Sequence, residues 1–268
     1  MNRILAILLL GILGINTSKA QTTPFTLGET HQLSSAVLNE TRTLNVYLPD
    51  GYAQAVNARY PVVYLLDGSA NEDFIHIAGV MQFLTMIQHM PPTILVGIAN
   101  KDRKHDFTFP TTVKKDKADY PTTGGSEKFI RFLDTELKPY VQQHFRTNDT
   151  TTLVGQSLGG LLATEILLKH PAMFNNYIIV SPSLWWDQES LLKQAGKLLA
   201  TTGSAQANVF LTVGKEGKMM EEPARQLGDV LKANPGIRVH YVPLPDETHL
   251  TILHNGAYKA FQLLNGAK

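Results

Sequence analysis

The chain has 268 residues, of which 43% are hydrophobic, and a formal net charge of +1. That length and apolar content are enough for one large core, and α/β folds of this size are commonly single domains. The near-neutral charge, with no basic block along the chain, argues against a nucleic-acid partner, which would require a concentrated basic surface.

Residues 1–20 have the features of a cleavable secretory signal: a positively charged start, an apolar segment over 4–15, and the small-x-small sequence Ser18-Lys19-Ala20. The apolar segment is too short to span a bilayer as a helix. We therefore predict a mature chain of residues 21–268, a single domain exported to a bacterial periplasm or to the medium. Because the chain has no cysteine, its core and not disulfides must stabilise it.

Alternating and continuous apolar runs predict strands, and apolar residues at helical spacing predict helices. Strands that alternate with helices imply a mostly parallel sheet with helices on both faces, here preceded by an antiparallel hairpin. No regular element is predicted over residues 99–125, and a loop this long is more often functional than idle. In chain order the predicted elements are strands at 31–38, 43–48 and 61–66, a helix at 73–90, a strand at 93–98, a helix capped by Ser126, a strand ending near Gly155, a helix at 161–170, a strand at 176–180, a helix at 189–200, a strand at 208–213, a helix at 219–232, a strand at 237–242 and a helix at 257–264.

The sequence Gly155-Gln156-Ser157-Leu158-Gly159 joins an apolar run to a helical pattern. Gly-x-Ser-x-Gly in this position is typical of a nucleophile elbow, a strained turn that holds a serine hydroxyl clear of the sheet. The glycines let the strand and the helix approach without a Cβ clash. The alternative is a plain glycine-rich turn, but the position between strand and helix favours Ser157 as a nucleophile.

A serine hydroxyl needs a base, and histidine suits that role because its pKa lies near neutral pH. We predict His249, in the loop after the last strand, where the chain order of this type of site places the base; His254 is the alternative. A carboxylate is expected to orient the imidazole, and Glu216, just after the preceding strand, occupies the expected position. Asp246 and Glu247 compete for this role, and a serine–histidine dyad without an acid stays open.

An oxyanion hole requires two preorganised donors. The backbone N–H of Leu158, at the start of the helix after the elbow, is predicted to be one. The N–H of Ser69 is predicted to be the other, because it follows Asp67-Gly68 at the end of a buried strand. The alternative for Asp67-Gly68 is an ordinary turn that ends the strand.

Substrate contacts are predicted from residues in loops at the same edge of the sheet. Trp185 and Trp186 are candidate walls of a pocket, with core packing as the alternative. Arg103 is a candidate contact for an anionic substrate, although a solvated face is the usual role of a single arginine. The sequence has no metal-ligand spacing and no phosphate-binding loop, so we predict no metal, no cofactor and a small-molecule substrate.

With these residues the chain resembles the “putative esterase” family of α/β-hydrolases, and within it the periplasmic trilactone-siderophore esterases. The similarity implies an α/β-hydrolase fold and a serine esterase that forms an acyl-enzyme from a siderophore or another acyl ester. Family members commonly carry histidine where this chain has Gln156, and some siderophore esterases are thought to work as dyads, which leaves the role of Glu216 open. A secreted acyltransferase of the same fold and a non-catalytic binding module are the alternatives, and the oligomeric state is not predicted. The stretches that carry the resemblance are residues 60–68, Arg103-x-x-Asp106-Phe107-Thr108 with Pro110, 124–140, 155–160 and 181–186.

Overall fold

The computed structural model of the chain describes residues 21–201 and 206–266, so the predicted signal at residues 1–20 lies outside the described part. Its centre is an eight-stranded sheet in the order β1-β2-β4-β3-β5-β6-β7-β8. The β1–β2 and β2–β4 pairs are antiparallel and the others are parallel, which confirms the predicted sheet with its N-terminal hairpin. The strands are β1 (Glu29–Ser35), β2 (Glu40–Tyr47), β3 (Tyr60–Leu65), β4 (Ile94–Ile98), β5 (Thr147–Gln156), β6 (Asn176–Val180), β7 (Ala207–Thr212) and β8 (Ile237–Tyr241).

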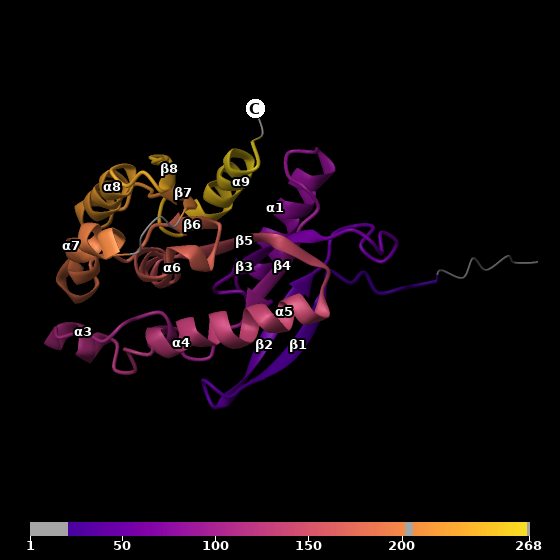
Figure 1. Cartoon of the computed structure of the whole chain (residues 1–268), viewed down its shortest axis with the longest axis horizontal. Helices are drawn as coiled ribbons and strands as arrows, with labels where there is room; N and C mark the ends of the chain where they lie inside the picture. The colour runs from indigo at the N-terminus through magenta and orange to yellow at the C-terminus, as the bar shows by residue number, and fades with distance from the viewer. Residues whose placement is uncertain (1–20, 202–205, 267–268) are drawn as a thin grey trace, which may run out of the picture.

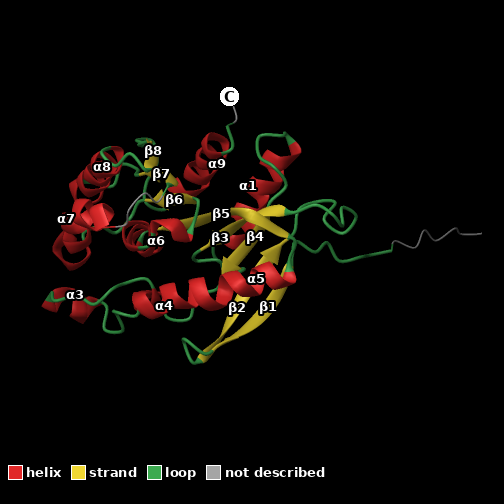
Figure 2. Ribbon diagram, viewed as in Figure 1, coloured by secondary structure: helices red, strands yellow, loops and turns green. Residues whose placement is uncertain are grey.

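Helices cover both faces of this sheet, as predicted (Figures 1 and 2). Helices α1 (Phe74–Met86) and α9 (Ile252–Leu264) lie side by side on one face. The opposite face carries α4 (Ser126–Phe132), the π-helical turn η1 (Leu133–Leu137), α5 (Lys138–His144), α6 (Leu158–Lys169), the 3₁₀ turn η2 (Pro171–Met173), α7 (Trp186–Thr201) and α8 (Lys218–Lys232). The segment predicted to be irregular contains two short helices, α2 (Arg103–Asp106) and α3 (Lys114–Asp119).

The continuous apolar run of β3 is buried on both faces of the sheet. Val62 and Tyr64 pack into the core beneath α4–α8, whereas Val63 and Leu65 pack into the core beneath α1 and α9. Successive side chains of a strand point to opposite faces, so a central strand covered on both sides must be apolar at every position. The sheet therefore separates two cores.

Two local predictions differ from the structure, one at α4 and one at α9. The N-cap of α4 is Gly125, and Ser126 is not the cap; the N–H of Ser126 donates to Thr108 O, so loop carbonyls replace the expected side-chain cap. Helix α7 is close to its prediction: it spans Trp186–Thr201, but Asp187, Gln188 and Glu189 have left-handed backbone angles, so the right-handed helix begins just after the predicted residue 189. Helix α9 begins at Ile252, before residue 257, because Gly256 packs against Thr212 inside the helix and does not end it.

The register of the parallel strands brings their carboxyl ends to one edge. Gln156 of β5 pairs with Val180 of β6, which in turn pairs with Thr212 of β7. The loops after β3, β5, β6, β7 and β8 therefore open at the same edge, where ligands bind in open α/β sheets. Among the described helices, none combines the length and the apolar character needed to cross a membrane.

Candidate active site

Ser157 lies between β5 and α6 in a backbone conformation that L-residues rarely adopt, with φ 60° and ψ −119°. Its N–H donates to Val180 O at 3.0 Å, and its carbonyl accepts from the N–H of Ser183 at 3.0 Å. A Cβ at Gly155 would lie 2.3 Å from Gly159 O, so only glycine fits there. The surrounding hydrogen bonds maintain this strained backbone conformation, as expected for an elbow that presents a reactive hydroxyl.

His249 and Glu216 meet in a short hydrogen bond of 2.5 Å between Nδ1 and Oε2. The Glu216 side chain is 3% exposed, and its other oxygen accepts from Ser181 Oγ at 2.5 Å and from the N–H of Gly214 at 3.0 Å. Burial by itself raises the pKa of Glu216, but the hydrogen bonds from His249, Ser181 and Gly214 more than offset burial and lower the pKa below its usual value. The ionised carboxylate is thus held where it can orient an imidazole.

Asp246 and Glu247, the two alternatives to Glu216 in the sequence, have other surroundings. The Glu247 side chain accepts from Asn255, and its carbonyl accepts from the N–H of Lys215 at 2.8 Å. Asp246 is exposed. The alternative base His254 stacks on His76 across α1 and α9, with ring centroids 5.9 Å apart. Within the described residues, Glu216 is therefore the carboxylate that the structure brings to His249.

The Ser157 hydroxyl lies 3.4 Å from Ser183 Oγ. No hydrogen bond in the described part of the chain joins it to His249. Catalytic hydrogen bonds are often long or misaligned without substrate and tighten when it binds.

The two N–H groups predicted as oxyanion donors, those of Leu158 and Ser69, both follow strands at the carboxyl edge of the sheet. Leu158 is the first residue of α6, where backbone N–H groups lack a partner within the helix. Ser69 lies in the loop after β3, and among the described residues its N–H has no acceptor. That loop is fixed because Gly68 donates its N–H to Ile98 O at 3.0 Å and accepts from the Asn45 side chain at 2.8 Å.

Arg103 connects the loop after β3 to the elbow. Its guanidinium donates to both oxygens of Asp67, at 2.6 and 2.9 Å, and to Gln156 O at 3.2 Å. Asp67 has a positive φ of 56° and immediately precedes Gly68. The fork geometry of arginine matches this bidentate contact, so Arg103 ties together the two backbone segments that carry the predicted oxyanion donors.

The two tryptophans have different environments. Trp186 is completely buried, and its Nε1 donates to Phe109 O at 3.0 Å, which corresponds to the core-packing alternative. Trp185 is partly exposed, and its ring lies 6.0 Å from that of Tyr120. Of the two, Trp185 has the exposure that a pocket wall requires, and the buried ring of Trp186 contacts it edge-to-face, with ring centroids 6.1 Å apart.

Sequence reasoning missed four side chains that contact the site. Ser181 and Ser183 follow β6, and their position at the edge shared with the elbow is a signal in the sequence that points to the site. Asp67 follows a buried strand, and its pairing with Arg103 has no signature in the sequence. Gln156 donates to His249 O at 2.5 Å, so the residue that replaces the usual histidine of the resembled family links the elbow to the histidine loop.

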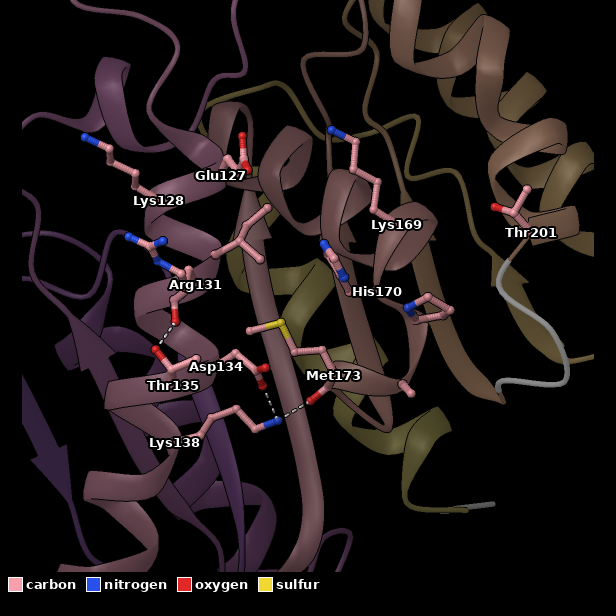
Figure 3. A pocket seen from close by; sticks show the side chains of 13 residues that line it. Glu127, Lys128, Arg131, Asp134, Thr135, Lys138, Lys169, His170, Met173 and Thr201 are labelled. Atoms are coloured by element: carbon pink, nitrogen blue, oxygen red, sulfur yellow. Dashed lines mark hydrogen bonds and ion pairs between the residues drawn. The ribbon is translucent and has the colours of Figure 1, made fainter. Parts of the chain in front are cut away.

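A groove of about 870 Å³ lies away from these residues, between α4–η1 and α6–η2 (Figure 3). Lys138 in this groove donates to Met173 O at 2.6 Å and pairs with Asp134 at 3.5 Å. Lys169, on the other wall, pairs with Glu165 at 2.6 Å.

Across the two described ranges, no cluster of three His, Cys, Asp or Glu side chains is arranged to hold a metal ion.

Comparisons with known proteins find esterases among the similar chains. A family model described as “Putative esterase” matches residues 35–234. The chain is 31% identical over 265 residues to the ferri-bacillibactin esterase BesA of Bacillus subtilis (strain 168), and the match covers 88% of each chain.

Two solved structures are similar over most of their length. An IroE-like serine hydrolase from Shewanella oneidensis superposes with a TM-score of 0.82 at 31% identity, covering 89% of this chain and 80% of the other. The BES protein from Bacillus cereus superposes with a TM-score of 0.80 at 27% identity, covering 92% and 99%. Together with the sheet order, these similarities confirm the α/β-hydrolase fold expected from the sequence.

Proposed function

The chain belongs to the putative esterase family, and from this premise we propose that it is an exported serine carboxylic-ester hydrolase that works through an acyl-enzyme. The observation that carries the proposal is the contact of His249 with Glu216 beside a strained serine in the elbow position. The proposed mature enzyme is the single domain of residues 21–268. Export rests on the signal-like sequence of residues 1–20.

In the proposed mechanism, Ser157 Oγ attacks the ester carbonyl while His249 Nε2 takes its proton. The C–O bond to the alcohol then breaks, and the imidazolium gives that proton to the leaving oxygen. A water molecule loses a proton to His249 as it attacks the acyl carbon, and Ser157 regains its proton as the acid departs. The N–H groups of Leu158 and Ser69 hold the oxyanion in both halves.

The proposed substrate class is a siderophore ester. Support comes from BesA, whose name describes hydrolysis of ferri-bacillibactin and which is 31% identical to this chain. The test is to measure kcat/KM of the purified protein on trilactone siderophores, acetylated or feruloylated carbohydrates and short p-nitrophenyl esters. A preference for the carbohydrate esters would contradict the siderophore assignment but not the esterase mechanism.

Two further assays separate the alternatives left open by the sequence. Product analysis with added alcohol distinguishes hydrolysis from acyl transfer, since a transferase would form a new ester. Labelling of Ser157 by a fluorophosphonate probe distinguishes an enzyme from a binding module. We expect the free acid as product and a labelled Ser157.

Replacing Ser181 with alanine is expected to lower kcat about tenfold with little change in KM, because one hydrogen bond to the Glu216 carboxylate is lost. The pKa of Glu216 should rise toward its usual value, which would shift the acid limb of the pH–rate profile. The control is Thr212→Val, which removes an equally buried hydroxyl that donates to Val242 O. An unchanged kcat and pH profile in Ser181→Ala would show that Ser181 does not position the acid.

Replacing Arg103 with lysine is expected to lower kcat/KM on a neutral p-nitrophenyl ester by roughly 10- to 100-fold, because lysine cannot reproduce the bidentate contact with Asp67. The control is Arg225→Lys in the exposed pair with Asp229, where we expect little effect. If Arg103 acts only on anionic substrates, the neutral ester would be hydrolysed at the wild-type rate. That result would favour the substrate-binding role predicted from sequence over positioning.

A further inference from the structure

The outer face of α1 exposes large apolar side chains. Of the eight large hydrophobic residues that are exposed in the described part of the chain, three belong to this helix: Ile75 (56% exposed), Phe83 (43%) and Met86 (62%). A fourth, Leu263, lies on the neighbouring helix α9. The Phe83 ring lies 6.4 Å from that of Tyr258 of α9, so the two helices share one surface.

This surface carries little charge, and its α1 part carries none. The 13 residues of α1 include no Asp, Glu, Lys or Arg, and the 13 of α9 include only Lys259. A helix on the surface of a soluble domain normally carries charged and polar residues on its solvent face. Depletion of charge together with Phe and Met is typical of the centre of a protein–protein interface.

Gly79 lies in the middle of the exposed face. A Cβ at this position would have no heavy atom of the described residues within 4 Å, so nothing in the described part of the fold requires glycine there. Glycine inside a helix is about 1 kcal/mol less favourable than alanine. The missing side chain does, however, allow another helix to approach closely.

The arrangement around Gly79 is symmetric in sequence. Ile75 precedes it by four residues and Phe83 follows it by four, which places all three on one side of the helix. When two copies of α1 cross antiparallel at Gly79, Ile75 of each copy meets Phe83 of the other. Such reciprocal contact is the property of an isologous interface about a two-fold axis.

We propose that the α1 face, formed by Ile75, Gly79, Phe83 and Met86, is the interface of a homodimer. A second copy fits because an uncharged face meets its own copy without like-charge repulsion. A membrane surface fits less well, because helices that bind membrane interfaces carry Lys or Arg on their polar side. Each helix is about 20 Å long, so the interface is small and the dimer is expected to dissociate in the micromolar range.

A single-cysteine variant tests the geometry, because the chain has no cysteine of its own. Under mild oxidation at a protein concentration above the dissociation constant, Gly79→Cys is expected to form disulfide-linked dimers, since the two positions meet at the symmetry axis. The control is Val56→Cys, at a loop residue that is 64% exposed. Equal cross-linking of the two variants would overturn the proposed crossing point.

Sedimentation equilibrium tests the association. We expect a concentration-dependent dimer in the wild type, and a dissociation constant raised at least tenfold by Phe83→Glu but not by Val56→Glu. Both variants should keep the wild-type circular dichroism spectrum and activity on a p-nitrophenyl ester. A wild type that stays monomeric at about 100 times the micromolar scale expected for a small interface would overturn the proposal. A monomer that co-sediments with phosphatidylcholine vesicles through the α1 face would overturn it in favour of a membrane.

Discussion

Replacing Ser157 with alanine is expected to lower kcat on a p-nitrophenyl ester by about 10⁴-fold or more, because no other group can form the acyl-enzyme. The fold should be retained. Alanine keeps the Cβ and the backbone N–H that donates to Val180 O, and it loses only a hydroxyl that contacts Ser183 at 3.4 Å. The measurement is steady-state kinetics together with thermal unfolding.

A second substitution at the same position separates strain from chemistry. Ser157→Gly should be as inactive as the alanine variant, but its unfolding temperature should be higher, because glycine adopts φ 60° without the cost that a Cβ imposes. The gain in the free energy of unfolding is expected to be on the order of 1 kcal/mol. Wild-type turnover in either variant would contradict Ser157 as the nucleophile.

The main catalytic candidates were predictable because each follows a predicted strand. Gly-x-Ser-x-Gly marks the turn after β5, and Glu216 and His249 follow β7 and β8 in the expected order. Parallel strands place all three loops at one edge, so strand order was enough to predict that Glu216 and His249 would lie near each other. The contact between them could be anticipated, but not its length or the burial of the carboxylate.

Contacts between side chains from distant loops were not predictable. The Arg103–Asp67 pair joins residues 36 positions apart through loop conformations that have no periodic signal. Trp185 and Trp186 are chemically identical neighbours, and only the course of the chain into α7 decides that Trp186 is buried while Trp185 is partly exposed. The prediction that Ser126 caps its helix was wrong, because carbonyl groups of another loop accept hydrogen bonds at the start of this helix. This is a tertiary effect.

Replacing Glu216 with glutamine is expected to lower kcat by about 10⁴-fold, close to the effect of losing the buried acid of a serine–histidine–aspartate triad. An amide can donate to His249 Nδ1, which stabilises the tautomer that cannot accept the Ser157 proton. It also cannot stabilise the imidazolium that forms during the reaction. The measurement is kcat on a p-nitrophenyl ester, with KM expected to change little.

The matched control is Glu247→Gln, which changes the competing carboxylate in the same loop as His249. If kcat falls in Glu247→Gln and not in Glu216→Gln, the acid was assigned to the wrong residue; if it falls in neither, the enzyme works as a dyad.

The stability of the fold gives an independent test, because the pKa of Glu216 lies below its usual value of 4.5 in the folded chain. Its ionised form therefore stabilises the fold above about pH 4.5, and this contribution is lost as the pH falls through the lowered pKa. The difference in unfolding free energy between wild type and Glu216→Gln should accordingly be largest near neutral pH and shrink in acid, whether or not the carboxylate takes part in catalysis.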